Sequence, residues 1–273
     1  MKMLHFLILL CLTSAAFSQL SVMSYNIRYD NAGDSLDAWP NRRANVVAFL
    51  QYYHPEIIGL QEALHHQVNY IDDSLDQYAF VGVGRDDGSI KGEFSPIFYD
   101  SSQLSLINSS TFWLSETPEE VSVGWDAALP RICTWAIFED KAAGRQLLVL
   151  NTHFDHIGEK ARQEAAILIL QRIQPLIKDE SMPVILMGDL NALPEIRAIG
   201  HIQSTLTDTY LFANHHGPDG TFNGFGFPTR NVPRIDYVFT RNLQVVEHAH
   251  LLPFTDNYRQ LSDHWPVWVI LKY

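Results

Sequence analysis

One pattern recurs along this chain: a short apolar, β-branched run closes on an acidic, amide or imidazole side chain. Such runs predict buried strands. Any one of the closing residues, taken alone, is best explained as a turn residue or a helix cap. Because so many apolar runs close in this way, the pattern favours one shared site at an edge where strands end. The closing residues are Asn26, Glu62, His153, Asp155, Asp189, Asn191, Asp236, Asp263 and His264.

Helical patterns alternate with these runs. Apolar residues at helical spacing predict helices at residues 41–53, 65–75 and 159–178, and Pro175 is expected to loosen the last turn of the third. Strands are predicted at residues 21–28, 56–60, 78–84, 94–99, 131–139, 146–153, 183–187, 234–240, 243–250 and 265–271. No Pro/Ser-rich linker divides the chain, which predicts one α/β domain with sheets packed on each other and helices outside.

The first eighteen residues have the pattern of an export signal. Lys2 supplies a positive start, residues 4–12 are apolar apart from His5, and Ala16-Phe17-Ser18 forms a small-x-small cleavage site. The apolar run is about half of the roughly 20 residues that a membrane span needs, so no transmembrane span is predicted. We expect a bacterial-type Sec signal at residues 1–18, a single domain at residues 19–273, and export to the periplasm or the extracellular space. A buried N-terminal strand is the alternative.

The charge balance restricts the partners. The chain has 19 Lys and Arg against 31 Asp and Glu, a net charge of −12, and removal of Lys2 with the signal makes it −13. An acidic protein is poorly suited to coating nucleic acid or anionic membrane by bulk electrostatics. The charge does not exclude an enzyme that binds one phosphate at a metal site.

The closing residues suggest a metal and a type of reaction. Carboxylate and amide oxygens are the ligands that Mg²⁺ or Mn²⁺ requires, whereas Cys-rich zinc patterns and His-Glu-x-x-His are absent. No Ser, Cys or Lys nucleophile motif accompanies them, which favours direct attack by water over a covalent intermediate.

An ordered set of motifs resembles the endonuclease/exonuclease/phosphatase (DNase I-like) superfamily and covers nearly all of the predicted mature chain. The likeness is greatest to exported bacterial members related to the deadenylase-like branch, with residues 125–131 as a supporting match. It implies a four-layer αββα sandwich, two packed mixed β-sheets flanked by helices, with the active site on one edge. The motifs are Ser24-Tyr25-Asn26-Ile27-Arg28, Gly59-Leu60-Gln61-Glu62, Asn151-Thr152-His153, Gly188-Asp189-Leu190-Asn191, Arg234-Ile235-Asp236-Tyr237 and Ser262-Asp263-His264-Trp265-Pro266-Val267.

The resemblance also implies roles around the metal and the water. Glu62 is expected to be the principal metal carboxylate, assisted by Asn26 and Asp263, with Mg²⁺ or Mn²⁺ as the cofactor. Asp189 is expected to orient or deprotonate the attacking water, and Asn191 to hold the scissile phosphate.

The remaining implied roles concern the imidazoles. His264, paired with Asp236, and His153 are expected to donate to the phosphate oxygens. Glu93 is placed like the acidic partner that some family members give to the His153-type histidine, although a surface glutamate is an equal alternative. Arg131 is a candidate phosphate contact, with a structural ion pair as the alternative.

These observations predict a divalent-metal-dependent hydrolase that cleaves phosphate esters by metal-assisted in-line attack of water. A small molecule or a lipid headgroup is favoured as the substrate, and no obligate protein partner is inferred. The alternatives are a nuclease, either a 3′-to-5′ RNA exonuclease or a secreted endonuclease, and an inactive surface-binding module, which would leave gaps in the motif set. The aromatic residues of the long loops have two interpretations: they stack a base or sugar of the substrate, or they only stiffen the loops. These residues are Trp39, Trp125, Phe222, Phe225 and Phe227.

Overall fold

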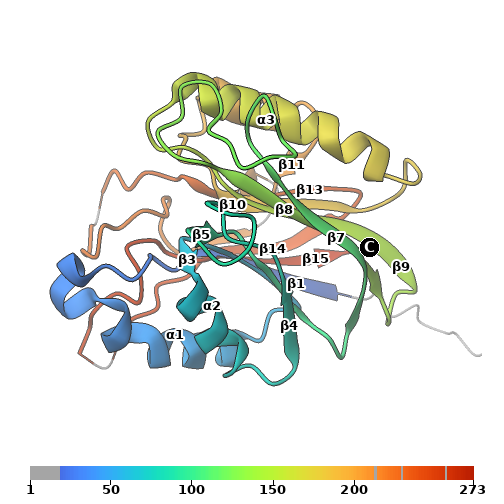
Figure 1. The fold of residues 1–273 in the computed structure, drawn as a ribbon. Helices are drawn as coiled ribbons and strands as arrows, with labels where there is room; N and C mark the ends of the chain where they lie inside the picture. Colours follow the sequence, from blue (N-terminus) through green and yellow to red (C-terminus); the bar gives the residue numbers. More distant parts are fainter. Residues whose placement is uncertain (1–18, 212–213, 229, 256) are drawn as a thin grey trace, which may run out of the picture.

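The computed structural model describes residues 19–211, 214–228, 230–255 and 257–273, so the predicted signal at residues 1–18 lies outside the described chain. Two β-sheets pack face to face, and helices cover both outer faces (Figure 1). The seven-stranded sheet runs in the order β12 (Asn214–His216), β14 (Gln244–His250), β15 (Val267–Lys272), β1 (Gln19–Asn26), β2 (Ile57–Gln61), β6 (Ile97–Asp100) and β4 (Tyr78–Val81).

The second sheet has six strands, and a short two-stranded ribbon lies beside the pair. Both large sheets are mixed. In the first, β1 pairs in parallel with β2 and antiparallel with β15, and in the second, β10 pairs in parallel with β9 and antiparallel with β13. The six-stranded order is β11 (Thr207–Asp208), β13 (Asp236–Arg241), β10 (Val184–Asp189), β9 (Arg145–His153), β8 (Ile132–Asp140) and β7 (Leu104–Trp113); the ribbon joins β3 (Ala63–Leu64) to β5 (Glu93–Phe94).

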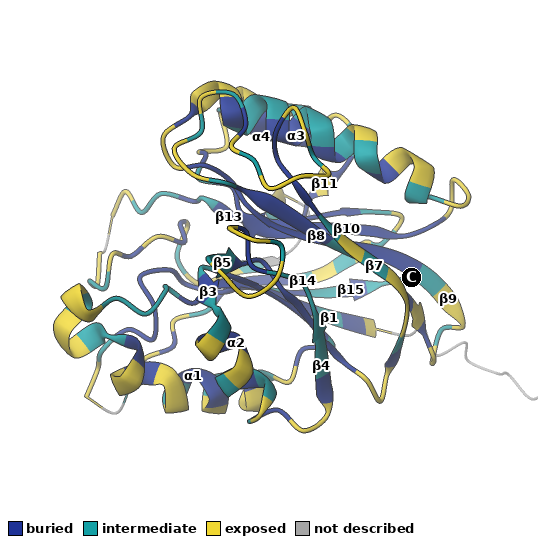
Figure 2. Ribbon diagram, in the orientation of Figure 1, coloured by how far each residue is buried: buried dark blue, intermediate teal, exposed yellow. Residues whose placement is uncertain are grey.

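Within the described ranges, four α-helices form the outer layers. The seven-stranded sheet packs on α1 (Trp39–Tyr53) and α2 (His65–Asp72), and the six-stranded sheet packs on α3 (Glu159–Ile173) and α4 (Arg197–Gln203) (Figure 2). A third apolar core lies between the sheets. The predicted four-layer αββα sandwich is therefore confirmed. Short 3₁₀ turns complete the described elements: η1 (Ala32–Asp37), η2 (Gln174–Leu176) and η3 (Thr209–Leu211).

Alternation along the strands decides which side chains face the space between the sheets. In β1, Val22 packs in the core between the sheets, whereas Met23 packs toward the helices. Successive strand side chains point to opposite faces, so Asn26 lies on the same face as Val22. In β10, Ile185 lies in the core between the sheets and Asp189 continues that face. The same alternation places Gln61, His153 and Asp236 on the inner faces of their strands.

The structure differs from the sequence prediction at several elements. The short strands β3, β11 and β12 were not predicted, and the strand predicted at residues 94–99 is divided into β5 and β6. The α3 helix ends at Ile173 rather than at residue 178, and Pro175 lies in the 3₁₀ turn that follows, as its missing N–H leads one to expect. Strand β7 was not predicted, because Asn and Ser interrupt its apolar alternation on an exposed edge. Helix α4 was not predicted either, since seven residues with a central glycine give a weak periodic signal. No helix within the described ranges is long and apolar enough to cross a membrane.

Candidate active site

The predicted site residues gather at one edge of the sandwich. The carboxyl ends of the parallel pairs β1–β2 and β9–β10 reach this edge. Strand β13 runs antiparallel to β10 and begins there, so Asp236 pairs in register with Asp189, which also pairs with His153. Asn26 and Glu62 come from the opposite sheet. Each sheet therefore supplies part of one polar cluster.

The Asn26 amide connects the two halves of the cluster. Its Nδ2 donates to Glu62 Oε1 at 3.0 Å and to Asp189 Oδ2 at 3.0 Å, and lies 3.5 Å from His264 Nε2. Its Oδ1 accepts the backbone N–H of Arg28 at 3.0 Å. The nitrogen, rather than the oxygen, faces the carboxylates, so Asn26 can serve as a metal ligand only if its amide turns over.

Arg28 is a site residue to which the sequence prediction assigned no role. Its guanidinium lies 3.8 Å from Glu62 Oε2 and 3.8 Å from Asp263 Oδ2, between the two predicted metal carboxylates. Asp34 holds it with two contacts, at 3.0 and 3.1 Å. Hydrogen bonding to Asp34 raises the pKa of Arg28, so the guanidinium stays charged and offsets the carboxylates.

His264 and Asp236 form the predicted pair. His264 Nδ1 lies 2.8 Å from Asp236 Oδ2, and His264 Nε2 lies 3.8 Å from Asp189 Oδ2. Burial opposes protonation, but Asp236 and Asp189 outweigh it and hold the pKa of His264 well above its ordinary value. Burial and the neighbouring Asp236 raise the pKa of Asp189. A protonated His264, which can donate a hydrogen bond, therefore lies beside the Asp189 carboxylate, which can accept a proton.

His153 differs from His264 in its protonation state. Burial, followed by the charge of Arg131, lowers its pKa to about 3, so the imidazole is neutral. Its Nε2 lies 3.1 Å from Asn191 Nδ2 and 3.5 Å from Asp189 Oδ2. The structure therefore brings His153, Asn191 and Asp189 together, as the resemblance implied.

The two tentative residues lie beside His153. Glu93 Oε2 is 3.5 Å from His153 Nδ1, the position expected of an acidic partner. Its strongest contacts, however, are with Arg85, whose guanidinium donates to both carboxylate oxygens at 2.7 and 2.9 Å. Arg131 is 4% exposed and pairs with Asp155 through Nε at 3.4 Å, as in the ion-pair alternative. Its contact with phosphate stays a prediction.

Three non-glycine residues at this edge adopt left-handed backbone angles. Arg28, Glu62 and Asn191 have φ of 58°, 59° and 45°. Such angles are uncommon for residues with a Cβ and persist where the surroundings hold them. Asp189 Oδ1 accepts the N–H of Asn191 at 2.9 Å, which stabilises one of these bends. The three bends follow directly on the ends of β1, β2 and β10.

Two of the predicted substrate-stacking aromatics, Trp39 and Phe222, differ in exposure. Trp39 is 2% exposed and belongs to the core beneath α1, so it cannot stack a substrate. Phe222 is 37% exposed, and its ring lies 5.0 Å from that of His264 in an edge-on arrangement. Phe222 therefore borders the cluster.

The donor set fits a hard divalent cation. Glu62, His153 and Asp189 offer ligand atoms within 4.8 Å of one another, and so do Asp189, Asp236 and His264. Glu62 and Asp263 flank a cation already, the Arg28 guanidinium, which shows that this position favours positive charge. The site is rich in oxygen donors and contains no thiolate among the described residues, a composition that suits Mg²⁺ or Mn²⁺.

The carboxylates and imidazoles gathered at the ends of the inner strands form a site suited to acid–base chemistry. The profile described as the Endonuclease/Exonuclease/phosphatase family matches residues 23–264, and the chain belongs to that family.

Several relatives support this assignment. An endonuclease/exonuclease/phosphatase family protein from Bacteroides thetaiotaomicron is 37% identical, with a TM-score of 0.89 over 94% of this chain and 98% of that one. The mannosyl-6-phosphatase of the same organism is 38% identical, with a TM-score of 0.88 over 93% of this chain and 100% of that one. Tyrosyl-DNA phosphodiesterase 2 of Danio rerio is 22% identical over 92% of this chain and 66% of its own length. The branch within the family stays a prediction.

Proposed function

We propose that this protein is a divalent-metal-dependent hydrolase of phosphate esters that positions a water molecule for in-line attack on the phosphorus atom. The observation that carries the proposal is the convergence of Glu62, Asp189 and His264 on the Asn26 amide, from both sheets, at 3.0 to 3.5 Å. Hydrolysis of a phosphate ester needs neutralised phosphate oxygens and a positioned water, and this cluster contains groups suited to both tasks.

Each residue of the cluster has a task in the proposed reaction. Glu62 and Asp263 would hold Mg²⁺ or Mn²⁺, which when bound offsets charge on the phosphate and leaving oxygens. Asp189, whose pKa is raised by burial and Asp236, accepts a proton from the attacking water. The His264 imidazolium and the Asn191 amide donate to the phosphate oxygens.

A small phosphate ester is the proposed substrate. The net charge of −12 supports this choice, because a long polyanion gains affinity from extended basic surfaces. The 38% identical relative named for a mannosyl-6-phosphatase also supports it, since its name specifies a sugar phosphate.

Removal of the metal tests the proposal. We expect a chelator to abolish hydrolysis of a small phosphate ester and added Mg²⁺ or Mn²⁺ to restore it. The fold should persist in chelator, because two carboxylates do not form a structural metal cage. Glu62→Gln should require a higher metal concentration for half-maximal activity, whereas Glu139→Gln, on the exposed part of β8, should behave as the wild type.

Two outcomes would contradict the proposal. Full activity after exhaustive chelation would remove the metal from the mechanism. A strong preference for RNA or DNA over small esters, collapsing steeply with salt, would instead indicate a nuclease with an extended phosphate-binding groove. Comparing kcat/KM for both substrate types at several salt concentrations distinguishes these cases.

A further inference from the structure

Arg28 lies at the catalytic cluster, directly beyond the end of β1, and has no part in the proposed reaction. Its Nη1 is 3.8 Å from Glu62 Oε2, and its Nε is 3.8 Å from Asp263 Oδ2. These separations exceed the length of a hydrogen bond, so the guanidinium borders both predicted metal carboxylates without occupying their oxygens. A phosphate that is bound at Glu62 and Asp263 through a cation therefore lies beside a second positive charge.

Asp34 anchors one edge of the Arg28 guanidinium. Arg28 Nε donates to Asp34 Oδ2 at 3.0 Å, and Nη2 donates to Asp34 Oδ1 at 3.1 Å. Asn31 fixes the carboxylate in turn, because its amide donates to Asp34 Oδ1 at 3.2 Å. Arg28 Nη1 makes no hydrogen bond with another described residue, and the side chain is 23% exposed. An anchored guanidinium with an unused donor is suited to an anionic oxygen.

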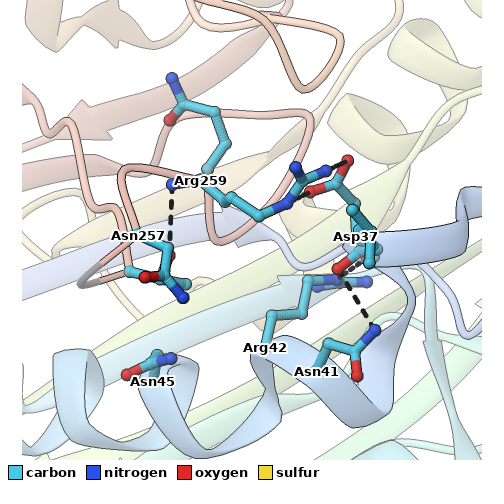
Figure 3. A pocket seen from close by; sticks show the side chains of 9 residues that line it. Asp37, Asn41, Arg42, Asn45, Asn257 and Arg259 are labelled. Carbon is cyan, nitrogen blue, oxygen red and sulfur yellow. Dashed lines mark hydrogen bonds and ion pairs between the residues drawn. The ribbon is translucent and has the colours of Figure 1, made fainter.

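The backbone of Arg28 is held as well as its side chain. Its carbonyl accepts from Arg42 Nη2 at 2.7 Å and from Gln67 Nε2 at 3.0 Å, and its N–H donates to Asn26 Oδ1 at 3.0 Å. Figure 3 shows Arg42 on α1 beside Asp37, whose carbonyl also accepts from Arg42 at 2.8 Å. These contacts hold Arg28 at φ 58°, a conformation that persists only where the surroundings fix it. The guanidinium is therefore in place before a ligand binds.

Arg28 adds a donor at a different carboxylate from the His264 donor. The Asn26 amide joins the two carboxylates concerned, since Nδ2 donates to Glu62 and to Asp189 at 3.0 Å. A phosphate bound across this amide meets His264 near Asp189 and Arg28 near Glu62. A phosphomonoester has three non-bridging oxygens to satisfy such donors, whereas a diester has two and carries a second substituent. That substituent would cover the Arg28 N–H without accepting from it, and a buried donor without a partner weakens binding strongly.

We propose that Arg28 selects phosphomonoesters over phosphodiesters, by donating through Nη1 to a non-bridging oxygen that a diester lacks. The proposal rests on the proposed function and narrows its substrate class to phosphomonoesters. Asp34 holds the guanidinium for this contact, and Arg42 and Gln67 hold the backbone that carries it.

The Arg28→Gln variant tests the selection, because it removes the charge and the unused donor. We expect kcat/KM for p-nitrophenyl phosphate to fall roughly 10- to 100-fold, as the loss of a charge-assisted hydrogen bond produces. Hydrolysis of bis(p-nitrophenyl) phosphate should be unchanged or faster, so the preference for the monoester falls. Arg145→Gln is the matched control, since Arg145 is exposed at the start of β9 and His153 lies at the other end of that strand. It should change neither rate.

A third variant addresses the fold. Arg28→Lys keeps the charge but not the two-point contact with Asp34, and should show a monoester preference between those of the wild type and Arg28→Gln. Thermal unfolding identifies any variant that is not folded under the assay conditions. If Arg28→Gln is unfolded, the preference of Arg28→Lys decides: a preference equal to that of the wild type would overturn the selection.

Binding measurements do not depend on turnover. Isothermal titration with added Mg²⁺ should show that the wild type binds inorganic phosphate more tightly than dimethyl phosphate. Arg28→Gln should weaken phosphate binding about tenfold and leave dimethyl phosphate binding unchanged. Titration with Mg²⁺ alone should give an affinity for Arg28→Gln at least equal to that of the wild type, because loss of a neighbouring cation does not disfavour Mg²⁺.

The outcomes separate this inference from the proposed function. Equal loss for the monoester and the diester in folded Arg28→Gln, or no loss for either, would overturn the selection and leave Arg28 as a structural ion pair with Asp34. That result, with active wild type, leaves the proposed function standing. If the wild type hydrolyses no ester with added metal, yet its phosphate binding depends on Arg28, the proposed function fails and the Arg28 contact stands.

Discussion

At the scale of single residues, His264 shows how its neighbours set the chemistry of a side chain. Burial alone would keep its imidazole neutral, but Asp236 at 2.8 Å and Asp189 at 3.8 Å make the charged form the stable one. Because Asp236 engages Nδ1, the Nε2–H is free to point toward the centre of the cluster. In the proposed reaction, that N–H donates to the phosphate.

We expect His264→Ala to lower kcat by roughly 100- to 10,000-fold while leaving KM nearly unchanged, because the donation strengthens in the transition state. Asp236→Asn should cost less, since the imidazole remains and loses only the carboxylate that orients it. Steady-state kinetics measure both effects. A folded His264→Ala enzyme with near-normal kcat would remove His264 from the mechanism, and a variant that unfolds at much lower temperature would make it a core histidine.

Much of the cluster could be predicted from the sequence, because strand alternation is a local property. Asn26, His153 and Asp189 lie an even number of residues from the apolar residues of their strands that pack between the sheets, so they share the inner face. Arg28 lies beyond the end of β1 at φ 58°, so strand alternation does not place it, and its position depends on its pairing with Asp34. Arg85 could not be found in this way, since it lies in a loop whose path depends on its pairing with Glu93.

At the scale of elements, the closeness of the two sheets beneath the site depends on Gly59 in β2. A Cβ on this residue would lie 2.7 Å from the Met187 methyl and 2.8 Å from Asn151 Oδ1. The Met187 methyl can move, but Asn151 cannot. Its amide donates to the carbonyls of Leu60 and Pro96, both at 2.8 Å, and accepts from Gln61 at 2.7 Å. The amide network therefore fixes the sheet separation.

We expect Gly59→Ala to lower the free energy of unfolding by about 1–3 kcal/mol, the usual cost of overpacking a core. The matched control is Gly200→Ala in α4, where a Cβ meets nothing within 4 Å. That change should be neutral or stabilising by about 0.5–1 kcal/mol, since alanine is the better helix former. Urea unfolding measures both, and a Gly59→Ala protein as stable as the wild type would contradict this account of the packing.

Most of the predicted elements were found because their apolar periodicity is strong. The strands predicted at residues 131–139 and 146–153 are confirmed as β8 and β9, and the turn between them contains Gly144 at φ 62°. Strand β7 was missed because its stability comes from pairing with β8 rather than from its own pattern. Tertiary contacts of this kind leave little local signal.

At the scale of the whole molecule, a group of buried histidines makes stability depend on pH. His248 and His250 in β14 pack with His215 of β12 around the Tyr210 ring. Burial, followed by the neighbouring histidines, lowers the pKa of His248 to about 2, and burial lowers that of His250 to about 4. Both imidazoles are neutral in the folded protein, while the unfolded chain protonates them below about pH 6.5.

The sign of the dependence follows from proton uptake. Below about pH 6.5 the unfolded state binds more protons than the folded state, so the stability is fully present at higher pH and is lost on acidification. We expect the wild type to lose about 1.4 kcal/mol per pH unit per histidine between about pH 6 and 4.5. His248→Gln removes one of the two titrating histidines. The stability of this variant should therefore fall with acidification by about 1.4 kcal/mol per pH unit less than that of the wild type. Urea unfolding at several pH values provides the comparison, and parallel slopes for the two proteins would refute the assignment.

The pairing of β1 with β15 has a consequence for how the molecule is made. Gln19 lies opposite Lys272 in this antiparallel ladder, so the first and last described strands are neighbours at the centre of one sheet. During synthesis, β1 can pair early with β2 on one side, but its other neighbour, β15, leaves the ribosome long afterwards. Asp263 and His264 also come late, just before β15. A nascent chain can therefore pair β7, β8, β9 and β10 before β15 exists, yet its catalytic cluster is complete only after Asp263 and His264 have been synthesised.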